Sequence, residues 1–315
     1  MPTQQLRTTT HHIEIAAPAD TVYGLLADAT RWPVYFRPNV HVERLEGTDR
    51  TERLQMWATA GGQVKNWISR RDLDPVKRTI GFRQEVFKPP VAAMLGEWQV
   101  EATGAAASAL TLRHEFAAVD DDPDDFAWLT DVTNRNSTTE LANVKALAER
   151  GDRLGELVFS FADEVTVNGS GEDVYEFLYR ADEWPRRLPH VSRLDLTEDP
   201  DGVQTMIMDT RTKDGSTHTT ESIRVCFGPD RIVYKQTVVP ALMNAHTGEW
   251  TVVPDGDGVR VISRHTVEVK ESAIASVLGA DASVETARSF LRKALGGNSS
   301  ATLALAKEFA EGRRG

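Results

Sequence analysis

The chain has 315 residues, 40% of them hydrophobic and 26% charged, which is the composition of a soluble globular protein and enough length for two domains of ordinary size. The formal net charge of -11 argues against sequence-independent binding to nucleic acid, and no window approaches the roughly 20 apolar residues of a membrane span, so neither partner is expected. The single cysteine, Cys226, excludes an intrachain disulfide framework and a thiolate-rich metal site, and it predicts a reducing, cytoplasmic location.

The two halves of the chain carry the same markers in the same order. Val-Tyr at 22–23 and Trp-Pro at 32–33 return at 174–175 and 184–185, Gly-Glu-Trp at 96–98 returns at 248–250, and Arg-His at 113–114 returns at 264–265. Repeats of this length imply two copies of one domain rather than the short units of a solenoid. We expect an N-terminal domain at residues 1–152 and a C-terminal domain at 153–315, joined by a charged segment.

Each half shows the same order of predicted elements. A short alternating strand comes first, followed by a turn and by apolar residues at helical spacing, and then by a second short helix or loop with the Trp-Pro pair. About six strands follow, separated by turn-forming clusters. Each half ends in a long amphipathic helix, at about 136–150 and 299–311, for which Asn136 and Asn298 are the expected N-caps.

Two segments depart from this repeated order. The acidic run 120–125 is interpreted as a solvated loop before a helix at Asp125–Thr133 rather than as a metal site, and the C-terminal half carries an insertion near 272–283. An antiparallel sheet leaves one face wet unless a helix covers it. We therefore predict an α+β fold with two tandem domains, each a curved antiparallel sheet wrapped around its long C-terminal helix. A cavity between sheet and helix is the usual place for an apolar ligand.

Strand alternation groups three chemically unlike side chains on one face of the segment 65–72. Trp67, Ser69 and Arg71 share that face, and Thr220, Ser222 and Arg224 stand at the same parity in the second half. An arginine is rarely buried without a partner. The face is therefore either solvated or directed into a polar-lined pocket, and its repetition favours the pocket.

One histidine in each half lies on the apolar side of its strand. His114 shares its face with Leu112 and Phe116, and His265 shares its face with Val261 and Val267. Each is either a core histidine with satisfied hydrogen bonds or a cavity residue that transfers protons near neutral pH.

Further residues are candidates for substrate contact. Trp98 and Trp250 are either core or cavity wall, Trp32 is expected mainly to close one end of its domain, and Met56 lies in a β-rich segment. Asn39 and His190 follow the Trp-Pro segments and are candidates for the pocket mouth. Nucleophile elbows, phosphate-binding glycine loops and His-Glu-x-x-His are absent from the sequence, and neither a metal nor a cofactor is expected.

The motifs resemble the di-domain polyketide aromatase/cyclases of bacterial type II synthases, which belong to the helix-grip (START/Bet v 1-like) superfamily. The resemblance rests on Ala-Pro-Ala-Asp-Thr-Val-Tyr at 17–23, Ala-Thr-Arg-Trp-Pro at 29–33, Trp-Ile-Ser-Arg-Arg at 67–71, Arg-His-Glu-Phe at 113–116 and Asn-Ser-Thr-Thr at 136–139. It implies aldol cyclisation and dehydration of a poly-β-ketone, usually ketoreduced in the di-domain forms. The implied partners are an acyl carrier protein with a phosphopantetheine-linked polyketide and other synthase components.

The family's pocket residues fall on Trp67, Ser69 and Arg71, whereas the second half matches only at Ser222 and Arg224. Thr220 departs from the pattern, and so does Asn39, which stands where the family has a tyrosine. An arginine can stabilise an enolate oxygen, and a histidine can assist proton transfer.

Three hypotheses follow from the sequence. The first is an aromatase/cyclase that uses the Arg, Ser and His residues of one or both halves. The second is a non-catalytic carrier of a hydrophobic small molecule, against which the polar Ser-Arg face argues. The third is a chain in which one half only supports the other, and the sequence leaves open which half carries the chemistry.

Overall fold

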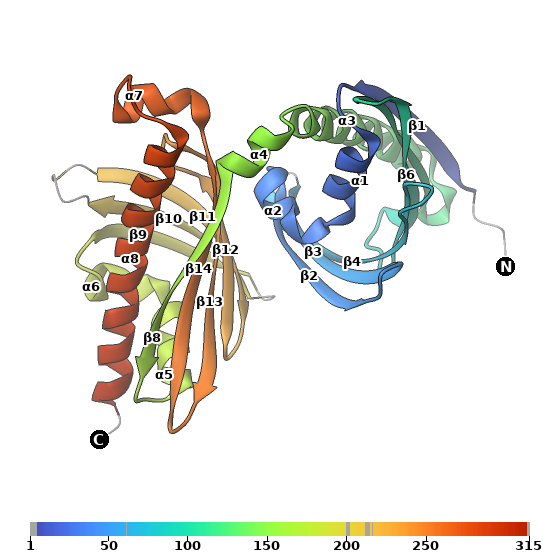
Figure 1. Ribbon diagram of the computed structural model, residues 1–315. Coiled ribbons are helices and arrows are strands. Elements are labelled where there is room, and N and C mark those ends of the chain that lie inside the picture. Colours follow the sequence, from blue (N-terminus) through green and yellow to red (C-terminus); the bar gives the residue numbers. More distant parts are fainter. Residues whose placement is uncertain (1–4, 61, 200–201, 212–214, 216, 314–315) are drawn as a thin grey trace. The chain divides into compact units, whose positions relative to one another are not determined.

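The structure is a computed structural model that describes all residues except 1–4, 61, 200–201, 212–214, 216 and 314–315. The chain divides into two compact units, Met1–Leu154 and Gly155–Gly315. Each unit is built on one seven-stranded antiparallel sheet (Figure 1). Within the described part of the chain, no helix combines the length and the apolar character needed to cross a membrane.

The first unit has the sheet order β1-β7-β6-β5-β4-β3-β2, so that its first strand pairs with its last. The long helix α3 packs against β1 and β7, and α1 packs against α3. The elements are β1 (Arg7–Ile15), α1 (Ala19–Ala27), α2 (Trp32–Tyr35), β2 (Asn39–Gly47), β3 (Thr51–Ala60), β4 (Gln63–Asp74), β5 (Thr79–Gln84), β6 (Val91–Gly104), β7 (Ala107–Ala118) and α3 (Pro123–Ala148).

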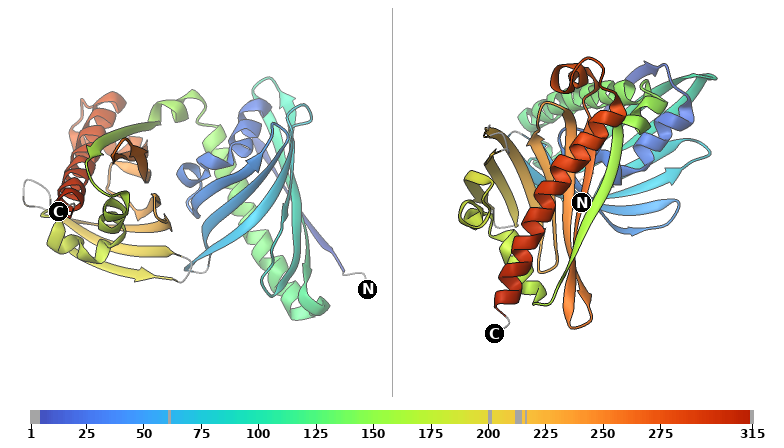
Figure 2. Two further views of the ribbon diagram at one scale, coloured as in Figure 1. Left: turned by 90° about the horizontal axis from the view of Figure 1, so that it is seen from below. Right: turned by 60° about the vertical axis from the view of Figure 1, so that its left-hand side comes forward.

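The second unit repeats this topology with the order β8-β14-β13-β12-β11-β10-β9. Helix α8 packs against β8 and β14 and runs along this sheet in all three views (Figures 1 and 2). The elements are α4 (Asp152–Leu157), β8 (Val158–Val167), α5 (Gly171–Tyr179), α6 (Trp184–Arg187), β9 (Val191–Glu198), β10 (Val203–Arg211), β11 (Thr217–Phe227), β12 (Arg231–Val238), β13 (Met243–Asp255), β14 (Gly258–Val269), α7 (Ile274–Leu278) and α8 (Val284–Gly312).

The predicted fold class is confirmed, because each unit is an antiparallel sheet covered by a long C-terminal helix. The predicted insertion is the segment with α7, which separates β14 from α8. Part of the charged segment between the two halves forms the short helix α4.

The expected start of each final helix was wrong. Helix α3 is continuous from Pro123 and is capped by Asp122, whose carboxylate accepts from the backbone N–H groups of Asp124 and Asp125 at 2.9 and 3.0 Å. Part of the acidic run is therefore a helix cap and first turn. Asn136 lies inside this helix, because buried Thr133 and Ser137 continue its packed face through the polar stretch.

Helix α8 likewise continues through Asn298, and its N-cap is Ser283 in a capping box with Thr286. The pair Gly296-Gly297 resembles a helix end in sequence. Gly296 is needed for packing instead, since a Cβ there would lie 1.9 Å from Arg292 Nη1 and 3.0 Å from Asp163 Oδ2. The glycine therefore leaves room for the ion pair between Arg292 and Asp163, which measures 2.6 Å.

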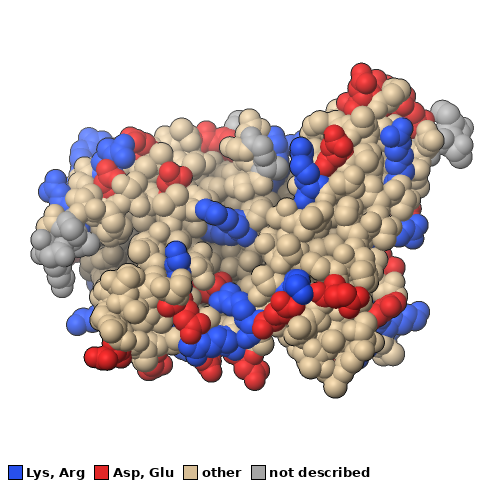
Figure 3. Space-filling model, turned by 90° about the horizontal axis from the view of Figure 1, so that it is seen from above, with Lys and Arg blue, Asp and Glu red and all other residues tan. Residues whose placement is uncertain are grey.

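The surface carries charges of both signs. Lysine and arginine side chains are interspersed with acidic ones on the face shown in Figure 3. Exposed ion pairs such as Arg193–Asp209 and Arg180–Asp182 join neighbouring side chains. On the face shown in Figure 3, the acidic side chains therefore do not form a single acidic field.

Candidate functional site

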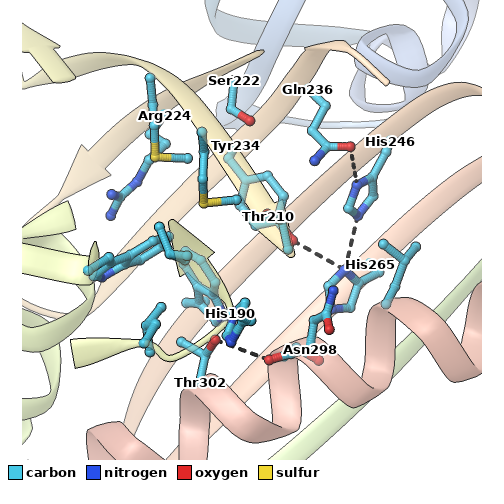
Figure 4. A pocket seen from close by; sticks show the side chains of 18 residues that line it. His190, Thr210, Ser222, Arg224, Tyr234, Gln236, His246, His265, Asn298 and Thr302 are labelled. Atoms are coloured by element: carbon cyan, nitrogen blue, oxygen red, sulfur yellow. Dashed lines mark hydrogen bonds between the residues drawn. The ribbon is translucent and has the colours of Figure 1, made fainter. Parts of the chain in front are cut away.

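A cavity of about 110 Å³ lies in the second unit, between the sheet and α8. Its wall combines side chains of β10–β14 with Asn298, Ser299 and Thr302 of α8, and Trp184 of α6 contributes an aromatic surface (Figure 4). Alternating strand residues face inward while the helix closes the open side. The predicted interior cavity is therefore present in this unit.

Five polar side chains form a connected cluster on one side of this cavity. His265 on β14 lies 3.0 Å from His246 (Nδ1 to Nε2), 3.2 Å from the Tyr234 hydroxyl and 3.2 Å from the Ser263 hydroxyl. His246 Nδ1 lies 2.9 Å from Gln236 Oε1 (Figure 4). The two imidazoles stack with ring centroids 5.3 Å apart. The cluster is a continuous hydrogen-bonded chain along the cavity wall.

With the Gln236 carboxamide in this orientation, the hydrogen bonds assign the protons of the cluster. A carboxamide oxygen only accepts, so His246 Nδ1 donates to Gln236 Oε1 and His246 Nε2 is left to accept from His265 Nδ1. His265 Nε2 is then unprotonated and accepts from the Ser263 hydroxyl. His265 therefore presents a basic nitrogen at Nε2.

Both imidazoles are neutral at physiological pH. Burial lowers the pKa of His246 to about 3 and that of His265 to about 4. Burial also raises the pKa of the Tyr234 hydroxyl, which therefore stays protonated. The cluster thus pairs a neutral base with a neutral proton donor and carries no net charge.

Arg224 on β11 supplies a cation to the same cavity, away from the histidines (Figure 4). It is 1% exposed, and its Nη2 donates to the Leu178 carbonyl oxygen at 2.5 Å. The guanidinium also lies over Trp184, 5.2 Å from the ring centroid. Burial lowers its pKa, but an arginine remains charged in proteins. Its Nε and Nη1 have no hydrogen-bond partner, so this cation still offers donors to a ligand.

The other second-half candidates divide between the cavity and its surroundings. Ser222, Trp250 and His190 line the cavity, and burial lowers the pKa of His190. Thr220 is buried and its hydroxyl has no hydrogen-bond partner, but it is not part of the cavity lining. The structure therefore brings together Arg224, Ser222, His265, Trp250 and His190, and leaves Thr220 beside them.

In the first unit, Arg71 has a different surrounding. It is 3% exposed, donates from Nη2 to the Leu26 carbonyl oxygen at 2.6 Å, and lies 5.1 Å from the Trp32 ring centroid. These contacts repeat those of Arg224. In addition, Arg71 Nη1 forms an ion pair of 3.0 Å with Glu52 Oε1, which is also buried. The charge of the guanidinium is therefore already paired, although Nη1 and Glu52 Oε1 are not aligned for a hydrogen bond.

The remaining first-half candidates are mostly packed into the core. Ser69 donates to the Arg83 carbonyl oxygen at 3.3 Å, and Trp98 is buried. Asn39 begins β2 and is half-buried. Trp32 and Trp67 pack against the hydrophobic cluster that contains Met56.

His114 has few polar neighbours. It lies 3.3 Å from the Ser137 hydroxyl and 5.4 Å from Phe82 between ring centroids. Its pKa falls to about 4, through burial and through the nearby His11. It is a neutral imidazole that, among the described residues, has no hydrogen-bonded histidine or tyrosine of the kind that accompanies His265.

Two site residues escaped the sequence analysis, Tyr234 and His246. Tyr234 pairs with Arg224 across the sheet as Phe82 pairs with Arg71, and His246 pairs with Val267 as Met94 pairs with Phe116. The signal that could have found them is the repeat itself. His246 stands two residues before the second Gly-Glu-Trp, where the first half has methionine.

The repeated glycine of Gly-Glu-Trp also has a physical explanation. A Cβ on Gly248 would lie 2.2 Å from Tyr234 ring and hydroxyl atoms, and a Cβ on Gly96 would lie 2.5 Å from the Phe82 ring. Each glycine therefore allows the aromatic ring of the neighbouring strand to lie flat across the sheet.

The family model for polyketide cyclase / dehydrase and lipid transport matches the chain twice, at residues 7–149 and 158–308. The granaticin polyketide synthase bifunctional cyclase/dehydratase of Streptomyces violaceoruber is 43% identical over 312 residues, which cover 99% of this chain and 96% of that protein. The actinorhodin polyketide synthase bifunctional cyclase/dehydratase of Streptomyces coelicolor is 45% identical over 303 residues, with 93% of each chain covered.

Two crystal structures extend the similarity to the whole fold. The di-domain ARO/CYC BexL from the BE-7585A biosynthetic pathway matches with a TM-score of 0.90 and 49% identity, covering 98% of this chain and 99% of that chain. The di-domain ARO/CYC StfQ from the steffimycin biosynthetic pathway matches with a TM-score of 0.87 and 36% identity, covering 97% and 99%. With both halves matched by the family model and its relatives aligned over nearly their full length, the chain belongs to the polyketide cyclase / dehydrase and lipid transport family.

Proposed function

We propose that the chain is a cytoplasmic aromatase/cyclase that closes and dehydrates a ring of a poly-β-ketone carried by an acyl carrier protein. The observation that carries this proposal is the cavity of the second unit, where an incompletely partnered guanidinium and a Tyr-His-His cluster face one space. The full-length similarity to proteins named cyclase/dehydratase supports the same reaction. The other components of a type II synthase are its working partners.

Arg224 is assigned to the developing negative charge. Aldol closure and dehydration both pass through an enol or enolate, whose oxygen gains charge as the α-proton leaves. The free Nε and Nη1 of Arg224 are buried donors that need no reorganisation to receive this oxygen. Ser222 lines the cavity on the same strand and is assigned a hydrogen bond to the substrate.

His265 and Tyr234 are assigned to the proton transfers of dehydration. His265 Nε2 accepts the α-proton, and the hydroxyl of Tyr234 gives its proton to the departing hydroxyl, which leaves as water. His265 Nδ1 then returns a proton to the Tyr234 oxygen, 3.2 Å away. His246 orients His265 from the opposite side. For the α-proton to reach His265 Nε2, the Ser263 hydroxyl must turn away from that nitrogen. The protons then balance, but the step leaves His265 protonated at Nε2 instead of Nδ1, and exchange of that proton with water restores the starting tautomer. The step exchanges no electrons with a cofactor.

The size of the cavity decides what enters it. The volume of about 110 Å³ is comparable with that of a cavity known to hold benzene, which is about 150 Å³. This space therefore takes about one six-membered ring, while the rest of a ketoreduced chain and its carrier arm extend outward. Trp184 and Trp250 provide the flat apolar walls such a ring needs.

The first unit holds the family's Trp67, Ser69 and Arg71, but Glu52 occupies the guanidinium and His114 lacks a second histidine. We assign Arg71 and Ser69 to structural support of the first unit. Trp67 is assigned to binding and support, together with Trp32, Trp98, Met56 and Asn39, rather than to proton transfer. Thr220 and His190 support the second site.

The test is product analysis of a minimal type II synthase with its ketoreductase, with and without this protein. A shift from shunt compounds to one product with an aromatised ring is expected, and Arg224→Met should abolish that shift in a folded chain. An unchanged product profile with folded wild-type protein would contradict the proposal. Tight stoichiometric binding of an apolar ligand alongside that profile would favour the carrier hypothesis.

A further inference from the structure

The two buried arginines differ in one neighbour on the adjacent strand. Arg71 is the cross-strand partner of Glu52, and Arg224 is the cross-strand partner of Gln204. The two arginines otherwise hold the same position, each tied to a carbonyl oxygen near the end of the preceding helix. A carboxylate in the first half is thus replaced by a neutral carboxamide in the second.

Glu52 neutralises its arginine directly. Its carboxylate lies 3.0 Å from Arg71 and 3.3 Å from the half-exposed Arg44, and it is 6% exposed. In a low-dielectric interior such a pair is largely neutral to its surroundings. An anionic ligand would have to compete with the Glu52 carboxylate for the Arg71 guanidinium.

Gln204 leaves its arginine uncompensated. Its Nε2 donates to Glu198 Oε2 at 3.1 Å and to the Tyr179 carbonyl oxygen at 3.4 Å, and its Oε1 has no hydrogen-bond partner. Glu198 is exposed at the edge strand and accepts from the Tyr179 hydroxyl. Among the described residues, no acid forms an ion pair with Arg224. Glu198 acts on Arg224 from the exposed edge of the sheet, where water screens its charge, so the potential in the cavity beside the guanidinium stays positive.

We infer that the second unit is a site for an anionic oxygen of an aromatic or enolised ring, that the first unit is not, and that Glu52 and Gln204 decide this difference. This inference rests on the proposed function for its biological substrate, but it concerns charge alone and is measured without a polyketide. The ligand class is a phenolate or an enolate of about one ring in size.

The probe is 4-nitrophenol, whose ionised and neutral forms absorb differently. A buried cation favours the ionised form of a bound phenol and lowers its pKa by about one unit or more. We expect one phenolate to bind per wild-type chain and to appear at lower pH than in free solution. The neutral analogue 4-nitroanisole, which has nearly the same shape and no ionisable oxygen, measures the cavity alone.

Gln204→Glu recreates the first-half arrangement in the second half. Phenolate affinity should fall about tenfold or more, while 4-nitroanisole affinity stays within about twofold. Because the new carboxylate would adjoin Glu198, Gln204→Glu with Glu198→Gln provides a second variant without that repulsion. The matched control is Glu52→Gln with Arg71→Met, which removes both buried charges of the first unit together and should leave phenolate binding unchanged.

Two results would overturn the inference: phenolate binding that survives both Gln204 variants, or phenolate binding that is lost in the first-unit control while circular dichroism and 4-nitroanisole binding remain intact. The outcome is separate from that of the synthase assay. Charge-dependent phenolate binding without any change in polyketide products would leave the inference standing and refute the proposed function.

Discussion

Acidification should destabilise the second unit more than the first, because the second unit buries two stacked neutral histidines whereas the first unit buries His114. The pKa of His246 is lowered to about 3 and that of His265 to about 4, whereas an unfolded histidine titrates near about 6.5. Above pH about 6.5 neither state takes up a proton, so this contribution to stability is fully present. As the pH falls below that value, the two histidines bind protons in the unfolded chain but not in the folded chain. The free energy of unfolding therefore decreases.

The size of the effect follows from the same two values. At pH about 5, an unfolded histidine is mostly protonated and the two folded ones are not, which costs about 2 kcal/mol for each, or about 4 kcal/mol in total. This is a large part of the free energy of unfolding of a typical domain, which is roughly 5 to 15 kcal/mol. His246→Met places the first-half residue at this position and should remove about half of this two-histidine contribution, or about 2 kcal/mol.

The assay is urea unfolding of the full chain at pH about 7 and about 5, with hydrogen exchange of peptides from β14 and α8 reporting on the second unit. The relevant quantity is the difference between the two pH values, so that a packing effect of the methionine cancels. The reasoning would be refuted by an equal loss of stability in wild type and His246→Met, since the buried imidazole would then not be the group that resists protonation.

Four further substitutions test the site and the helix that covers it. Tyr234→Phe copies Phe82 of the first half, so the chain should fold normally while dehydration slows by about 100-fold or more and the undehydrated ring accumulates in the reconstituted synthase. Gly297→Ala, at an exposed interior position of α8 where a Cβ meets nothing within 4 Å, should raise the free energy of unfolding by about 0.5 to 1 kcal/mol, whereas Gly296→Ala should lower it, because the added methyl group meets Arg292. Ser283→Ala removes the N-cap of α8 and should cost about 1 kcal/mol, measured by the same urea titration.

The fold was predictable from the sequence for two reasons. The alternation of apolar and polar residues indicates which side of a strand is buried, and the repeat provides the same pattern a second time. The order of one strand, short helices, six strands and a long helix agrees in the two halves, so each half supports the assignment of the other. The helix starts were not predictable from local signals. Asn136 and Asn298 have the character of caps, but packing of the buried helix face outweighs local preference.

The site was only partly predictable, because strand parity gives the face of a residue and not its neighbours across the sheet. Parity correctly directed Ser222, Arg224 and His265 toward the cavity. It gave no sign that Glu52 lies opposite Arg71, since that pairing depends on the register between β3 and β4. Whether a buried arginine can bind a ligand depends on which group already pairs with it, and for Arg71 that group, Glu52, lies on another strand.

The two halves show how one framework serves two purposes. In both, the arginine donates to a carbonyl oxygen in the last turn of a helix, at 2.6 Å in one half and 2.5 Å in the other, and lies over a tryptophan. Those carbonyls lack partners within their helix, so this contact stabilises the helix end in either half. The shared role of the arginine is therefore structural. What the second half adds lies in its neighbours: glutamine for glutamate beside the arginine, tyrosine for phenylalanine and histidine for methionine along the wall. The glutamine leaves the charge of the arginine available to a ligand, and the tyrosine and histidine place polar groups where the first half has apolar ones. None of the three changes disturbs the contacts that hold the arginine in place.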